Sequence, residues 1–339
     1  MIELDDLSQI YALDRERLLV RAGQVSDRWP MAQVAFAALS AQHDLEQFRI
    51  SNQNTVTTLS IVLILPPELV GIGRAVRSLC HQSTGLPLRL NLVLWDPDLP
   101  PGQISAPVLW LSAVPSATLH QLYALNTLTP LLDLSPFISA DQHPAQVFLF
   151  LLALLDQLSP EPALATAATA SLDQLSALMA TWTPGIPTAQ NQAKQLAIQL
   201  HERLPFFWGA GPLAAIAEDW RLRRLWYAEA MAWAAPTDEL VRIQVMARLP
   251  RYWFNIVTFV HLTSRLPNYS LISAEAKLDR LFTIRRLSSL RVTTPDELTL
   301  AGALWYYLEL GEWLALYAAA LYNVEPAERV PLQFLQDGI

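Results

Sequence analysis

Residues 58–65 read Thr-Leu-Ser-Ile-Val-Leu-Ile-Leu and are followed directly by two prolines. A short apolar run that ends at prolines is typical of a strand buried on both faces of a sheet. Similar runs follow at residues 88–95, 107–111 and 131–134. Helical patterns lie between them at 73–81 and 118–125. Strands that alternate with helices at this spacing predict a parallel sheet with right-handed crossovers.

The second half of the chain shows the same alternation of strand and helix patterns. Leu204 to Trp208 forms a short apolar run before the turn Gly209 to Pro212, and a long helical pattern follows. Residues 253–261 form another strand candidate. Thr294 to Glu297 reads Thr-Pro-Asp-Glu, which predicts an N-capped helix that continues to about Tyr322. Residues 159–167 contain two prolines and are interpreted as a linker between two α/β domains.

Composition excludes several classes of protein. The chain has 339 residues, of which 52% are hydrophobic and 16% charged, so it has enough apolar side chains for two cores. A net charge of −8 argues against binding to nucleic acid. The acidic segment Met1 to Ile10 does not resemble a signal peptide, and the apolar run at 147–155 is too short to span a membrane. We therefore expect a cytoplasmic protein without a membrane contact.

Metal and disulfide chemistry are also disfavoured. Cys80 is the single cysteine, so it has no intramolecular disulfide partner and cannot build a thiolate zinc site. The six histidines are scattered, without a pair at metal-ligand spacing. His261, at the end of the predicted strand 253–261, is more typical of a packed residue than of a ligand-binding one. We expect no metal and no cofactor.

Several segments, in order along nearly the whole chain, carry the motifs of one family. They are residues 7–14 with 17–19, residues 191–197 (Asn-Gln-Ala-Lys-Gln-Leu-Ala), residues 204–209, residues 311–320, residues 324–326 and residues 330–335. In these segments the chain resembles the bifunctional phosphoglucose/phosphomannose isomerases, which carry two sugar isomerase (SIS) domains. The third and fourth of these segments correspond to a strand and to the C-terminal helix of that family.

The resemblance implies a fold and a domain organisation. Each SIS-type domain is expected to be a parallel sheet flanked by helices, in a flavodoxin-like three-layer α/β/α arrangement. We expect N-terminal helices over 1–50, a first SIS domain over 51–160, and a second over 161–339 that ends in a long helix. The resemblance also implies a homodimer whose ligand is a phosphosugar or another small anionic metabolite.

Isomerisation of a sugar phosphate needs a group that holds the phosphate and a base that moves a proton between neighbouring carbons. The family's glycine-rich turn aligns with residues 65–73, where Gly71 and Gly73 remain and two prolines donate no N–H. The family's serine loop aligns with residues 111–119, where Ser112, Ser116 and Thr118 offer hydroxyls. These five residues are the predicted ligand contacts. The alternative is that they are ordinary loop and helix-capping residues.

The catalytic positions of the family are changed in this chain. An alignment anchored on Pro236 to Leu240 puts Trp226 at the position of the base, Arg242 at that of a histidine and Gln336 at that of a lysine. Tryptophan has no exchangeable proton near neutral pH, and arginine stays protonated. A register slip of three residues brings Glu229 to the base position, but it loses the match at Pro236 to Leu240.

Three functional hypotheses remain open. The first is an SIS protein that binds a phosphosugar although its catalytic residues have degenerated. The second is an active aldose–ketose isomerase of glucose 6-phosphate or mannose 6-phosphate to fructose 6-phosphate that uses Glu229. The third is a non-catalytic structural or interaction protein. The cluster Arg221, Arg223 and Arg224 fits either a phosphate site or, as we expect, one charged helix face.

Overall fold

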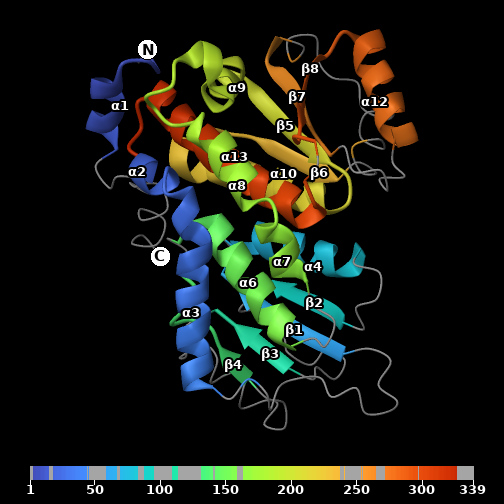
Figure 1. The fold of residues 1–339 in the computed structure, drawn as a ribbon. Coiled ribbons are helices and arrows are strands. Elements are labelled where there is room, and N and C mark those ends of the chain that lie inside the picture. Colours follow the sequence, from blue (N-terminus) through green and yellow to red (C-terminus); the bar gives the residue numbers. More distant parts are fainter. Residues whose placement is uncertain are drawn as a thin grey trace, which may run out of the picture. The chain divides into compact units, whose positions relative to one another are not determined.

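A computed structural model gives the structure of the chain (Figure 1). The residues that it describes are 3–14, 18–43, 45, 59–66, 69–82, 88–94, 109–113, 131–139, 142–158, 163–236, 240, 253, 255–264, 272–296 and 298–326.

The first sheet contains four parallel strands in the order β2-β1-β3-β4. The strands are β1 (Leu59–Leu65), β2 (Leu88–Leu94), β3 (Leu109–Ser112) and β4 (Leu131–Asp133). All four were predicted from their apolar runs, and their existence is confirmed. Helix α4 (Val70–Gln82) connects β1 to β2, where a helix was expected. The helix expected at 118–125 lies outside the described residues.

Three further described helices group with the first sheet: α3 (Arg28–Gln42), α6 (Pro144–Leu158) and α7 (Leu164–Thr169). The apolar run at 147–155 forms the centre of α6, where most side chains are buried. Helix α7 begins inside the segment interpreted as a linker, and that interpretation is wrong from residue 164 onward. The reason is a local cap, because the Asp156 carboxylate accepts the backbone N–H groups of Leu164 and Ala165 at 3.0 and 2.9 Å.

The second sheet repeats the strand order of the first. Its strands β5 (Leu204–Gly209), β6 (Trp233–Pro236), β7 (Val257–Thr263) and β8 (Ser288–Thr293) are parallel and lie in the order β6-β5-β7-β8. The strand candidate at 253–261 is β7, which begins four residues later. Parallel sheets flanked by helices confirm the predicted α/β class.

Helices cover both faces of the second sheet (Figure 1). Leu278 and Phe282 of α12 (Ile272–Arg285) pack against Phe206 and Trp208 on one face. On the other face, Phe207 of β5 contacts Trp220 of α10 (Pro212–Ala228), with ring centroids 5.5 Å apart. Other described helices that group with this sheet are α8 (Leu172–Ala180), the 3-10 turn η5 (Thr188–Gln190), α9 (Gln192–Leu200) and α13 (Leu300–Tyr322).

Helix α13 begins at Leu300, so the helix start predicted at Thr294 is wrong. The backbone N–H of Thr294 bonds to the carbonyl of Thr263 at 3.1 Å, which extends the pairing of β8 with β7. Thr294 is therefore held in extended backbone, although its sequence neighbours favour a capped helix. Local capping preference is overridden here by the sheet ladder.

Contacts divide the chain into two compact units that do not follow the sequence order. One unit, called here the first-sheet unit, contains Ser26–Ala170 and Leu300–Gly302. The other, the second-sheet unit, contains Met1–Val25, Ser171–Thr299 and Ala303–Ile339. Helices α1 (Leu7–Leu13) and α2 (Leu18–Ala22) thus group with the second sheet, while α3 groups with the first, and the short 3-10 turn η1 (Val25–Asp27) separates them. Within the described residues, no helix is long and apolar enough to cross a membrane.

Candidate functional site

Each sheet has a point where the strand order reverses, and open parallel sheets bind ligands at the carboxyl edge beside such a point. In the first sheet the reversal lies between β1 and β3, because β2 lies on one side of β1 and β3 on the other. In the second sheet it lies between β5 and β7. The two carboxyl edges are therefore the places to compare.

The first-sheet edge brings together Ser112 and the start of α4. Ser112 is the last residue of β3, is fully buried, and lies beside Ile64 near the end of β1. Gly71 and Gly73 are buried in α4 rather than in the turn that precedes it. Gly71 lies in the first turn of α4, so its N–H has no acceptor within the helix. Gly73 lies further along, where the N–H bonds to a carbonyl of the helix itself. Unpaired first-turn N–H groups favour anions.

Asp133 is an additional polar residue at the same edge. It ends β4 and is the register partner of Ser112. The side chain is half-buried, and its Oδ1 accepts the N–H of Ser135 at 2.8 Å. The strand was predicted from its apolar run, but Asp133 was not among the predicted site residues, although a carboxylate at the end of an apolar strand is a recognisable signal. A carboxylate here repels phosphate and accepts hydrogen bonds from hydroxyls.

The corresponding edge of the second sheet is closed by a tyrosine. The Tyr307 side chain of α13 is fully buried, and its hydroxyl accepts the N–H of Thr263 at 3.1 Å. The same hydroxyl lies 2.6 Å from the carbonyl oxygen of Thr263 and 2.7 Å from that of Val292. The backbone groups at the ends of β7 and β8 are thus satisfied within the protein.

The turn after β5 is also tightly packed. A side chain at Gly209 would put its Cβ 2.7 Å from the Cβ of Leu213, and Gly211 has a φ of 55°. Both positions therefore require glycine for packing and backbone reasons. The glycines of this turn are explained without a ligand.

The described catalytic candidates lie far from the carboxyl edge of their own sheet. Helix α10 starts at that edge and, with 17 residues, carries the chain about 25 Å away from it. Trp226 is half-buried near the end of α10, and Glu229 is the exposed C-cap residue in left-handed conformation, with a φ of 50°. Arg242, Gln336, Ser116 and Thr118 lie outside the described residues.

The arginine cluster on α10 is paired within the protein. Arg221 bonds to Glu218 at 2.6 Å, and the buried Arg223 lies 2.7 Å from Asp219 and 2.8 Å from Glu312. Burial alone lowers the pKa of Arg223, but its two carboxylate neighbours outweigh burial and raise it. The expectation of a single solvated charged face is wrong for Arg223 and for Arg224, since both are buried.

Arg224 is held by neutral groups. It donates to the carbonyl of Leu200 at 2.9 Å and to the hydroxyl of Tyr322 at 3.2 Å, and burial lowers its pKa. Its guanidinium carbon also lies 5.7 Å from the centre of the Tyr322 ring. These contacts tie α10 to the ends of α9 and α13.

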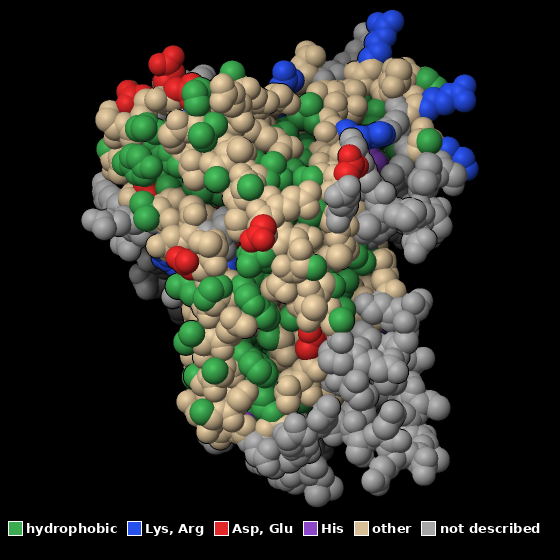
Figure 2. Space-filling model, viewed as in Figure 1, with side chains coloured by type: hydrophobic (Ala, Val, Ile, Leu, Met, Phe, Trp, Pro, Cys, Tyr) green, Lys and Arg blue, Asp and Glu red, His purple; other side chains and the backbone are tan. Residues whose placement is uncertain are grey.

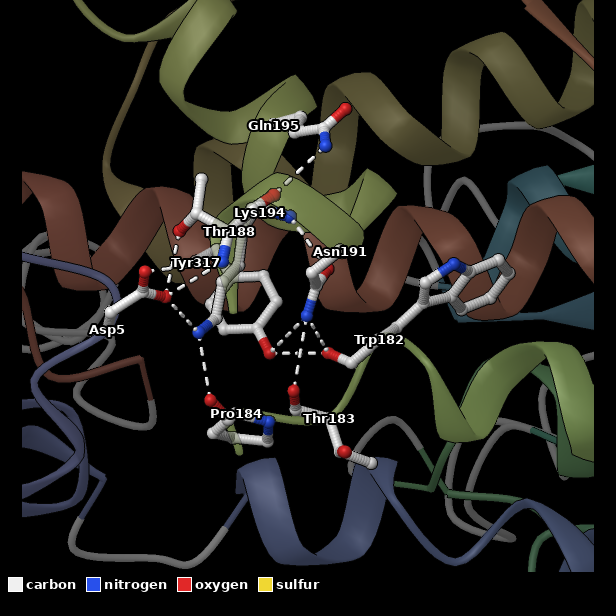
Figure 3. Close-up of polar contacts among 9 residues, drawn as sticks. All are labelled: Asp5, Trp182, Thr183, Pro184, Thr188, Asn191, Lys194, Gln195 and Tyr317. Atoms are coloured by element: carbon white, nitrogen blue, oxygen red, sulfur yellow. Dashed lines mark hydrogen bonds and ion pairs between the residues drawn. The ribbon is translucent and has the colours of Figure 1, made fainter. Parts of the chain in front are cut away.

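The segment 191–197, which carries part of the family resemblance, has a structural role in this chain (Figure 3). Asn191 caps α9 by accepting the N–H of Lys194 at 3.0 Å and donates to the carbonyl of Trp182 at 2.8 Å. The fully buried Lys194 donates to Asp5 at 2.8 Å and to the carbonyl of Pro184 at 2.8 Å. Asp5 also accepts the N–H of Thr188 at 2.9 Å. This cluster fastens the N-terminal segment to α9.

His261 and Cys80 show no sign of a reactive site. His261 is buried in β7 and stacks on Trp208, with ring centroids 3.6 Å apart and planes inclined by 8°. Burial raises the pKa of Cys80 to about 12, so its thiol stays protonated near neutral pH. Among the described residues, no group of three His, Cys, Asp or Glu side chains is arranged to hold a metal ion.

Comparison with known proteins adds the family context. Residues 189–338 match the bacterial phospho-glucose isomerase C-terminal SIS domain. No curated protein matches the chain in sequence.

Solved structures resemble the chain over most of its length. A glucose-6-phosphate isomerase like protein from Thermus thermophilus is 19% identical, with a TM-score of 0.54 and 100% of both chains covered. The tagatose-6-phosphate ketose/aldose isomerase from Escherichia coli is 11% identical, with a TM-score of 0.60 over 89% of this chain and 93% of the other. Glucosamine-6-phosphate deaminase from Thermotoga maritima is 9% identical, with a TM-score of 0.55 over 88% and 97%.

The fold is SIS-type. The chain thus shares its architecture with proteins whose names describe an isomerase and a deaminase. Because the SIS-type fold supports different reactions, the fold alone does not determine what this protein does.

Proposed function

We propose that this protein binds a phosphosugar at the carboxyl edge of its first sheet and does not isomerise it. The observation that carries the proposal is the difference between the two edges. At the edge of the first sheet, the start of α4 and Ser112 flank the reversal point. At the edge of the second sheet, the hydroxyl of Tyr307 is hydrogen-bonded to the backbone groups at the strand ends. In this proposal the N–H of Gly71 and the hydroxyl of Ser112 bind the phosphate, Gly73 lines the site without donating its N–H, and Ser116 and Thr118 supply further hydroxyls.

Two lines of support concern the ligand and the lost chemistry. The ligands named for the three structural relatives are all sugar 6-phosphates. Trp226 cannot act as a base. Glu229 is exposed at the end of α10 that faces away from the carboxyl edge of the second sheet, so it cannot serve as the base for a ligand bound at that edge. The homodimer and the cytoplasmic location implied by the resemblance stay predictions.

Isothermal titration with glucose 6-phosphate, mannose 6-phosphate and fructose 6-phosphate tests the binding site. We expect binding by the wild type and about fivefold weaker binding by Ser112→Ala, since one hydrogen bond contributes about 1 kcal/mol. Ser289→Ala is the matched control, because Ser289 is an exposed serine on a strand of the other sheet. Failure of the wild type to bind any of the three would leave an interaction protein as the better hypothesis.

A coupled isomerase assay with the same sugar phosphates tests the catalytic part. We expect no turnover above the uncatalysed rate. Turnover that disappears in Glu229→Gln would instead establish an active aldose–ketose isomerase with Glu229 as its base.

A further inference from the structure

We propose that the exposed face formed by α12 and β8 docks an acidic peptide segment of a partner protein that also carries an apolar side chain. The face, called here the basic face, consists of Lys277, Arg280, Ile284, Arg286 and Arg291. All five side chains are exposed. Figure 2 shows Lys and Arg side chains gathered where α12 lies, with Asp and Glu mostly elsewhere on this view.

Charge along the chain is unevenly distributed at this face. Residues 277–291 hold five cations, Arg285 included, against the single carboxylate Asp279, which gives the segment a net charge of +4. The whole chain has a net charge of −8. Charge is screened over about 8 Å at physiological ionic strength, so a small ligand at the basic face experiences a local positive field.

Three cations of the basic face differ from three other described cations of the second-sheet unit. Lys194, Arg221 and Arg223 each form an ion pair with a carboxylate. By contrast, the side chains of Lys277, Arg280 and Arg286 form no ion pair or hydrogen bond with the residues that the structure describes. All three side chains are exposed, so a carboxylate of an external partner can reach them.

The geometry of α12 adds an apolar contact to the charges. Lys277, Arg280 and Ile284 are three and four residues apart and share one stripe of the helix, opposite the buried Leu278 and Phe282. Ile284 is 69% exposed, which is among the highest values for a large hydrophobic side chain in this protein. An isolated isoleucine between cations suits a ligand that combines negative charge with an aliphatic group.

The field of the whole molecule favours a peptide over a nucleic acid. A long polyanion would extend beyond the basic face and meet the acidic remainder of the chain, which repels it. A short acidic segment fits within the screened positive field, and a leucine or valine within it can cover Ile284. In addition, β8 is an edge strand of the sheet among the described strands, and edge strands are common docking places for extended peptides.

Fluorescence anisotropy tests the proposal with a fluorescein-labelled peptide that alternates glutamate pairs with single leucines. We expect saturable binding by the wild type and at least about tenfold weaker binding by Lys277→Glu/Arg280→Glu. The matched control is Arg74→Glu/Arg77→Glu, which reverses two exposed cations at the same helical spacing on α4 and should bind as the wild type does. Circular dichroism of each variant checks that the fold is kept.

A second variant separates the apolar contact from the charges. Ile284→Ser should weaken binding a few-fold and leave the salt dependence unchanged, because it removes no charge. The proposal is overturned if the wild type does not bind the peptide, or if the Arg74/Arg77 control loses binding equally. It is also overturned if labelled oligothymidylate or phosphatidylserine vesicles bind more tightly than the peptide, since the face would then serve a nucleic acid or a membrane.

Discussion

At the scale of single residues, one buried arginine of α10 lies between two carboxylates. Arg223 is 4% exposed and lies between Asp219, which is fully buried, and Glu312, which is 4% exposed. Tyr227 donates a further hydrogen bond to Glu312 at 3.1 Å. Two carboxylates thus share one guanidinium, so its removal would leave two buried negative charges without a cation.

This arrangement predicts a large difference between two neighbouring arginines. Arg223→Met should lower the free energy of unfolding by about 3 kcal/mol or more, because breaking a buried ion pair leaves an uncompensated charge. Arg221→Met, two residues away on the same helix, should cost less than about 1 kcal/mol, since its pair with Glu218 is partly exposed. Urea denaturation of both variants measures the difference. Equal losses of stability in the two variants would contradict the role assigned to the buried group of Arg223, Asp219 and Glu312.

At the scale of elements, the packing of α10 against α13 depends on one glycine. Trp220 of α10 donates its Nε1–H to the carbonyl of Tyr307 in α13 at 2.8 Å. A Cβ added at Gly311 would lie 2.3 Å from that same Nε1. The glycine in the middle of α13 is therefore needed for the close approach of an indole.

We predict that Gly311→Ala destabilises the protein by about 2 kcal/mol, although alanine is the better helix former by about 1 kcal/mol. Adding Trp220→Phe to the Gly311→Ala variant should recover part of the lost stability, because the smaller ring leaves room for the methyl group of the alanine at position 311. Gly185→Ala is the control, since no atom lies within 4 Å of a Cβ there. Thermal unfolding by differential scanning calorimetry compares the four proteins. If Gly311→Ala were as stable as the wild type, Gly311 would not be needed for the contact between α10 and α13.

Sequence patterns predicted some elements better than others for a physical reason. Strands β1 and β3 were recognisable because central parallel strands are apolar along their length. Strand β8 was missed because it lies at an edge, where Ser289 and Arg291 are exposed and break the apolar run. Strand β6 is only four residues long and ends at Pro236.

The candidate site was predictable only where it depends on neighbours in sequence. Ser112 could be placed at the end of a strand, and the alignment suggested its role. The closure of the second edge could not be predicted, because Tyr307 is 44 residues away from Thr263 in sequence. Likewise, Glu312 is 89 residues from Arg223 and Asp5 is 189 residues from Lys194 in sequence, and residue patterns do not encode such contacts.

At the scale of the whole molecule, the N-terminal segment belongs to the second-sheet unit, although it precedes the first-sheet unit in sequence. The Asp5 carboxylate joins Lys194 and Thr188 across more than 180 residues. The hydrogen bond from Lys194, outweighing the effect of burial, lowers the pKa of Asp5 below its ordinary value of 3.8. The contribution of this contact to stability is therefore fully present above about pH 4, and it is lost as the pH falls through the lowered pKa.

Asp5→Asn removes the charge and keeps the shape, so it tests this connection directly. At pH 7 we expect a loss of about 1 kcal/mol, limited because the Asp5 side chain is 51% exposed to solvent. Wild type and variant should converge in stability as the pH falls well below 3.8, where both side chains are neutral. Glu3→Gln, a change at an exposed neighbour, should have the stability of the wild type at pH 7.

Hydrogen exchange should locate the loss in the second-sheet unit. In Asp5→Asn, amide protection should fall in α1, in η5 and in the first turn of α9, because these elements meet at Asp5, Thr188 and Lys194. Peptides from α3, α4 and α6, which belong to the first-sheet unit, should exchange as in the wild type. If α3 lost protection while η5 kept it, the N-terminal segment would instead stabilise the first-sheet unit, and the division of the chain drawn from its contacts would be wrong.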